Sequence, residues 1–164
     1  MTYLLDANIF IEAKNRYYGL DFCPAFWIWI LEKNQTGVVQ SIDKVADEID
    51  AGDDSLSEWA KENARHIFRN TDTSVLSQLG RVSIWATSQN YEPGAISTFY
   101  ESADYYLIGH ALAQSSAIVT HEVPSTSTKR IKIPNVCAGL GISFLNPFEM
   151  LRRERANFVL GGNV

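Results

Sequence analysis

Acidic side chains follow two short apolar runs of this sequence, a placement that can support catalysis. Asp6 comes directly after residues 3–5, with Asn8 close behind, and Glu122 follows the apolar run 117–120. Such continuous runs are typical of strands buried on both faces of a parallel sheet. Functional groups in these sheets lie just beyond the carboxyl ends of the strands. The local alternative is that Asp6 or Asn8 caps the next helix.

Two further acids are predicted to lie on inward-facing sides of helices. In the helix expected over residues 102–113, Asp104 shares a face with the apolar residues three, four and seven positions later. Glu48 flanks the apolar face of a helix expected over residues 41–51, which Ser41 can cap. A buried carboxylate needs a partner, or its pKa rises until it becomes neutral.

These four carboxylates could converge on one pocket. In a parallel sheet the strand ends and the starts of the following helices share one edge. Two unneutralised carboxylates 4 Å apart would repel by about 4 kcal/mol at an intermediate dielectric. A divalent cation removes that repulsion, and a set of oxygen ligands selects a hard ion, Mg²⁺ or Mn²⁺.

The remaining pattern predicts one α/β domain over residues 1–164, without repeats or linkers. Two further strands are expected, at 38–41 and at 142–145. One further helix is expected to begin at Pro24, and others are expected at 55–68, 75–88 and 148–155, with a loop at 90–94. The strongly apolar segment 25–31 is either core or a partner contact through Trp27 and Trp29.

Composition narrows the class of protein. The chain has 164 residues, 46% of them hydrophobic, which is a globular value. A net charge of −5 argues against a DNA reader with a broad basic face. The two cysteines lie far apart in the sequence and are expected to be free thiols in a reducing cytoplasm. The sequence shows no signal peptide and no long apolar run, which predicts an intracellular protein that does not enter a membrane.

The polar segments together resemble the four motifs of PIN domains, a family of metal-dependent ribonucleases that includes VapC-like toxins. The matching segments are Leu-Leu-Asp6-Ala-Asn8, Val-Ala-Asp-Glu48-Ile, Ala-Asp104-Tyr-Tyr-Leu-Ile and Ile-Val-Thr120-His-Glu122. The resemblance implies that Asp6, Glu48 and Asp104 are the core acids, while Glu122 stands where the family usually has Asp. It also implies that Asn8 and Thr120 support the site, and that the fold is a three-layer α/β/α PIN-like sandwich with a central parallel sheet.

The function expected from the resemblance is Mg²⁺-dependent hydrolysis of RNA, with the chain acting as the toxin of a toxin–antitoxin pair. The expected partners are RNA and a small antitoxin, with a homodimer left open. His121 is either a phosphate contact or a solvent-facing histidine of the loop. The RNA backbone could be held by basic residues whose other interpretation is ordinary surface charge, namely Lys14, Arg16, Lys129, Arg130 and Lys132.

Two alternatives come from other classes. One is an inactive PIN-like module that only binds proteins. The other is a phosphate-handling receiver or phosphatase domain, which would carry a second Asp where Asn8 stands. A P-loop is excluded because its Gly-rich, Lys-containing signature is missing.

Overall fold

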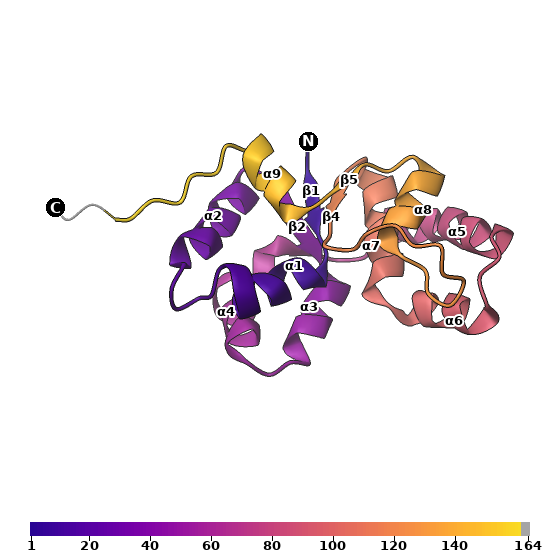
Figure 1. The fold of residues 1–164 in the computed structure, drawn as a ribbon, viewed down its shortest axis with the longest axis horizontal. Helices are drawn as coiled ribbons and strands as arrows, with labels where there is room; N and C mark the ends of the chain where they lie inside the picture. Colours follow the sequence, from indigo (N-terminus) through magenta and orange to yellow (C-terminus); the bar gives the residue numbers. More distant parts are fainter. Residues whose placement is uncertain (162–164) are drawn as a thin grey trace.

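A five-stranded parallel sheet forms the centre of the computed structural model, which describes residues 1–161 (Figure 1). The strand order is β3-β2-β1-β4-β5. In chain order the elements are β1 (Tyr3–Leu5), α1 (Ala7–Glu12), a π-helical turn (Ala13–Tyr17), α2 (Pro24–Gln35), β2 (Val39–Ile42), α3 (Asp43–Asp50), α4 (Ser55–Asn63), a 3₁₀ turn (Arg65–Ile67), β3 (Phe68–Arg69), α5 (Thr73–Ser88), α6 (Pro93–Glu101), α7 (Ala103–Gln114), β4 (Ala117–Val119), α8 (Ile133–Leu140), β5 (Phe144–Leu145) and α9 (Pro147–Arg153).

Helices cover both faces of the sheet. In Figure 1, α1 to α4 and α9 lie on one side of the strands, and α5 to α8 lie on the other. The predicted three-layer α/β/α sandwich with a central parallel sheet is therefore confirmed. Within residues 1–161, no helix is both long enough and apolar enough to cross a bilayer.

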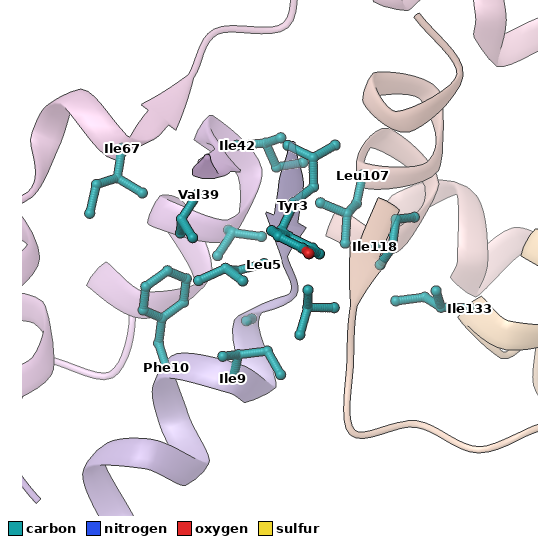
Figure 2. Packing of buried hydrophobic residues seen from close by; sticks show 14 of the residues in the cluster. Tyr3, Leu5, Ile9, Phe10, Val39, Ile42, Ile67, Leu107, Ile118 and Ile133 are labelled. Carbon is teal, nitrogen blue, oxygen red and sulfur yellow. The ribbon is translucent and has the colours of Figure 1, made fainter. Parts of the chain in front are cut away.

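The two central strands are apolar throughout because both of their faces are covered. All residues of β1 and β4 are buried, and Leu5 pairs with Val119 across the strand pair. Figure 2 shows side chains from the helices packing around them, including Leu107 of α7 and Ile133 of α8. The two cysteines are free thiols, as expected, with Cys137 buried.

The aromatic segment of α2 belongs to the core. Trp27 and Trp29 are 2% and 9% exposed, and the Trp27 indole N–H donates to the carbonyl of Tyr18 at 2.6 Å. Trp27 also packs edge-on against Trp59 of α4, with ring centroids 4.7 Å apart. The suggested partner contact through Trp27 and Trp29 is therefore wrong, because neither side chain reaches the surface to a useful extent.

Helix α7, which carries Asp104, is fixed against α5. A Cβ on Gly109 would stand 2.7 Å from Cδ2 of Leu79, so a larger residue here would require the Leu79 side chain to shift. The hydroxyl of Tyr105 lies 2.7 Å from the Ser83 hydroxyl and donates to the carbonyl of Leu79 at 3.1 Å. These contacts set the position of the first turn of α7 relative to the sheet.

Three local expectations are wrong. Ser41 does not cap α3; it lies in β2, where its buried hydroxyl donates to the carbonyl of Leu5 at 2.7 Å. The helix expected to reach Phe68 ends at Asn63, and Phe68 instead begins edge strand β3. Residues from Pro93 onward form α6 rather than extended loop, since proline at the first helical position fits its fixed φ.

Candidate metal centre

The strand order places a topological switch point between β1 and β4. From β1 the chain proceeds outward through β2 and β3, whereas β4 and β5 lie on its other side. In sheets of this kind, ligands bind in the crevice outside the carboxyl ends of the strands at the switch point. Asp6 directly follows β1, and Thr120 to Glu122 directly follow β4. Both sequence-predicted strand-end groups therefore lie at this edge.

Asp6 is held in the interior by the end of β4. Its backbone N–H donates to the carbonyl of Val119 at 3.0 Å, and the Thr120 hydroxyl donates to its carboxylate at 2.8 Å. The side chain makes no capping bond to α1, which rules out the purely local interpretation. Burial raises the pKa of Asp6 to about 7, against the hydrogen bond from Thr120 and with help from the charge of Glu122.

Asp104 interacts with the same group of acids from the first turn of α7. Burial is the largest cause that raises the pKa of this carboxyl to about 8, and the charge of Asp6 is the next. Glu122 and Glu48 also raise the pKa of Asp104, and only Arg130 opposes them. In the described part of the chain no hydrogen bond contributes to this shift. Asp104 is therefore a desolvated carboxyl that is influenced by Asp6, with little cationic compensation.

Glu122 is oriented by the start of α8. One carboxylate oxygen accepts the backbone N–H of Ile133 at 2.8 Å, and the other lies 4.0 Å from Arg130 Nη2. Its own N–H donates to the hydroxyl of Thr120 at 3.0 Å, so Thr120 joins Asp6 to Glu122. The side chain is only 10% exposed. Glu122 therefore serves α8 as well as the acidic site.

Glu48 occupies a more exposed place on α3. Partial desolvation of its carboxylate raises its pKa, and its charge in turn raises the pKa of both Asp6 and Asp104. Of the four acids it is the one whose side chain is exposed to solvent.

The donor chemistry of the four acids fits a hard divalent cation. Asp6, Glu48 and Glu122 all raise the pKa of Asp104, and desolvated, mutually repelling carboxylates are stabilised by such an ion. As positioned in residues 1–161, no three side chains from His, Cys, Asp and Glu are arranged to hold one ion. Binding would therefore require a movement of side chains, and Glu48 is the most exposed of the four.

Asn8 and His121 connect the two strand ends. The side-chain oxygen of Asn8 accepts the backbone N–H of His121 at 3.3 Å. Burial lowers the pKa of the His121 imidazole, which favours its neutral form. Asn8 therefore supports the site through the β4 segment rather than by capping α1.

The five basic candidates do not share one role. Arg130 and Lys132 line a groove of about 540 Å³ together with Asn8 and Glu122. Arg16 lines it too, paired with Glu12 at 3.1 Å. Lys129 lines a second hollow of about 350 Å³ together with Arg130 and Asp104. Lys14 lies on another part of the surface, where it forms an ion pair with Asp54 at 2.9 Å.

Sequence reasoning missed two aromatic residues next to this groove. Tyr17 lines the groove, and Phe148 lines its neighbour of about 430 Å³, with His121 shared by both. Tyr17 precedes a loop and Phe148 follows Pro147, so neither carries a motif. The signal that could have pointed to Tyr17 is its position four residues after Ala13, at the end of a helix that continues the first motif.

Replacing Thr120 by Val is expected to lower the free energy of unfolding by about 1–3 kcal/mol at pH 8, because Asp6 loses a buried hydrogen bond to its charged form. Urea unfolding of the metal-free protein measures this loss. Thr87→Val is the matched control, since its exposed hydroxyl bonds only within α5. Equal stability of the two variants would contradict the role given to Thr120.

Solved structures share this architecture. FitAcB from Neisseria gonorrhoeae is 17% identical with a TM-score of 0.57, and the match covers 90% of this chain and 99% of that chain. VapBC-1 from nontypeable Haemophilus influenzae is 13% identical with a TM-score of 0.54, covering 89% and 98%. FitAB bound to an IR36 DNA fragment is 17% identical with a TM-score of 0.58, covering 90% and 96%.

These likenesses define the class of fold: the chain has a PIN-like α/β/α fold with a central parallel sheet. A family model described as "Domain of unknown function (DUF4411)" matches residues 3–158, and the chain belongs to that family. No curated protein matches the sequence.

Proposed function

We propose that this protein is a Mg²⁺-dependent endoribonuclease that acts as the toxin of a toxin–antitoxin pair. The observation that carries the proposal is the pair of desolvated aspartates at the switch point of a PIN-like sheet: burial raises the pKa of both carboxyls, and the charge of Asp6 raises that of Asp104 further. Strongly perturbed carboxylates in a crevice are typical of catalytic or metal sites. The four PIN-like motifs agree with this interpretation, and residues 1–164 act as one nuclease domain.

In the proposed mechanism, Asp6 and Asp104 would hold the cation together with Glu48 and Glu122. When bound, Mg²⁺ (or Mn²⁺) lowers the pKa of water and neutralises charge on the scissile phosphate. Thr120 keeps the carboxylate of Asp6 oriented toward the site. Glu48, at the exposed side, orients the attacking water and accepts its proton. Products carry a 5′-phosphate and a 3′-hydroxyl.

Incubating the purified protein with single-stranded RNA in Mg²⁺, in Mn²⁺ and in EDTA tests the reaction. Cleavage is expected with either metal and should stop in EDTA. Ligation of an adaptor to the product ends identifies the 5′-phosphate. Cleavage that continues in EDTA and leaves cyclic phosphates would overturn the proposal, because it would point to metal-independent chemistry.

A small antitoxin is the proposed partner in the cytoplasm, since a free ribonuclease of this kind would poison its host. The name of the VapBC-1 neighbour agrees with the VapC-like toxins that the motifs of this chain resemble. Co-expression with the product of a short neighbouring reading frame should yield a stable complex and suppress RNA cleavage. A homodimer of the chain is compatible with this scheme, and size-exclusion chromatography with light scattering measures it.

The alternative is a PIN-like module that binds proteins and is catalytically inactive. The observation in its favour is that no three acidic, histidine or cysteine side chains in residues 1–161 are arranged around one ion position. Thermal unfolding with and without Mg²⁺ separates the two, because an ion that binds only the folded chain raises its melting temperature. An active site predicts such a rise, and an inactive module predicts none.

A further inference from the structure

Three aromatic rings from distant segments form a continuous group beside the acidic site. Tyr17 stacks on the imidazole of His121, with ring centroids 5.6 Å apart and an interplanar angle of 22°. Phe148 meets both rings at steep angles, 5.2 Å from Tyr17 and 6.1 Å from His121. We call Tyr17, His121 and Phe148 the aromatic shelf.

The shelf lies at the surface, with Tyr17 exposed and His121 and Phe148 half-buried. Tyr17 is 44% exposed, and it ends the π-helical turn that follows α1. That turn is closed by a bond of 2.7 Å from the N–H of Tyr18 to the carbonyl of Ala13. Single π turns occur frequently at functional sites because they redirect side chains. An exposed, stacked tyrosine at this position therefore calls for a binding role.

The shelf is fixed in register with the acids. His121 lies between Thr120, which bonds to Asp6, and Glu122, and its own N–H bonds to Asn8. The shelf also separates two hollows. Tyr17 and His121 border the groove of about 540 Å³, His121 and Phe148 border the groove of about 430 Å³, and Glu122 lines both. A strand lying in either groove would therefore meet Glu122 and lie beside rings of the shelf.

Basic side chains border the same groove on a chain whose net charge is −5. Arg16, Arg130 and Lys132 line it beside Tyr17. Arg16 and Arg130 are largely exposed, and Arg130 reaches Glu122 only at 4.0 Å. Aromatic faces flanked by cations are the arrangement that binds single-stranded nucleic acid, because bases stack on the rings and phosphates meet the cations.

We propose that the aromatic shelf is a stacking subsite for an unpaired base of the RNA strand, next to the position of cleavage. The subsite rests on the proposed ribonuclease function and assigns a substrate contact to that same site. It requires an unpaired base, since the faces of a base inside a duplex are already covered by its neighbours. His121 thereby contributes a ring face to the RNA instead of the phosphate contact expected from sequence.

Fluorescence anisotropy of a fluorescein-labelled octaribonucleotide, measured in EDTA at low salt, tests the subsite without cleavage. Tyr17→Ala and His121→Gln are each expected to weaken binding by about 10- to 100-fold, the usual loss for one stacked base. Tyr17→Phe and His121→Phe keep a ring and should bind within about twofold of wild type. Phe22→Ala removes an exposed aromatic ring away from the grooves and should change nothing.

An octaribonucleotide with one abasic position gives a second readout. When the abasic site falls at the position that stacks on the shelf, the missing base should weaken binding to the wild-type protein. The same abasic strand should bind Tyr17→Ala no more weakly than the intact strand does, because both changes remove the same contact. A duplex of equal length should bind wild type and Tyr17→Ala equally. If Tyr17→Ala binds like wild type, or if His121→Phe loses as much as His121→Gln, the stacking subsite is wrong.

Cleavage in Mg²⁺ separates this proposal from the proposed function. With the subsite in place, Tyr17→Ala should raise KM about 10-fold or more and leave kcat within a few-fold of wild type. If the wild-type protein cleaves RNA and Tyr17→Ala has an unchanged KM, the stacking subsite is wrong and the nuclease function stands. If RNA binding depends on the stacked rings but no metal-dependent cleavage occurs, the nuclease function is wrong and the subsite stands.

Discussion

Replacing Asp104 by Asn is expected to lower kcat/KM for Mg²⁺-dependent RNA cleavage by about 10³-fold or more. An amide has the shape of the carboxylate but carries no charge, so it binds the cation more weakly. The charge stabilisation that the cation gives the transition state is worth several kcal/mol, and the rate falls roughly tenfold for each 1.4 kcal/mol that is lost. Asp6→Asn should have the same effect, since both aspartates share the desolvated region. Initial rates on a fluorogenic RNA over a series of Mg²⁺ concentrations measure the loss.

Asp47→Asn provides the matched control. Asp47 is exposed on α3 next to Glu48, so this substitution removes the same charge outside the site. It should cleave RNA within a few-fold of wild type. A folding defect is easily separated from a chemical one, since Asn at position 104 relieves repulsion in the metal-free protein and should not destabilise it. Undiminished cleavage by Asp104→Asn would show that this acid has no part in the reaction.

The elements that support the site could be predicted because their signals are local. The apolar runs before Asp6 and Thr120 are too short and too continuous for amphipathic helices, and they form β1 and β4. Helical periodicity predicts that Asp104 lies in a helix on the same face as Leu107, Ile108 and Ala111, and α7 contains all four residues. Parallel strands then place the groups that follow them at one edge.

Other features depend on contacts between distant segments and leave no local signal. The two-residue strand β3 owes its existence to pairing with β2 at Ser41 and Ile42. The orientation of Glu122 is set by the N–H of Ile133, eleven residues later. The stacking of Tyr17 on His121 joins residues more than a hundred positions apart. Periodicity and motif spacing carry no information about such pairings.

Without metal, the protein is expected to lose roughly 2–3 kcal/mol of its free energy of unfolding between pH 6.5 and pH 8.5 through Asp6 and Asp104. Both carboxyls have folded-state pKa values, about 7 and about 8, above the ordinary value of 3.8. The folded chain therefore binds more protons than the unfolded chain throughout this window. Their stabilising contribution is fully present below pH 4 and is lost as the pH rises through 7 and 8.

Groups with the opposite sign act at lower pH. Burial lowers the pKa of His110 and His121, so their contribution rises with pH only up to about 6.5 and does not mask the loss above it. Urea unfolding in EDTA across the window should give a steep decline for wild type, a shallower one for Asp104→Asn, and the wild-type slope for Asp47→Asn.

Saturating Mg²⁺ should reverse the decline, because the cation binds the ionised carboxylates of the folded chain and stabilises it by mass action. The gain should therefore be largest at pH 8.5, where ionisation is otherwise most costly, and small at pH 6.5. The same Mg²⁺ addition should stabilise Asp104→Asn far less. A pH-independent Mg²⁺ effect, equal in wild type and Asp104→Asn, would show that the ion binds elsewhere and that these acids do not form its site.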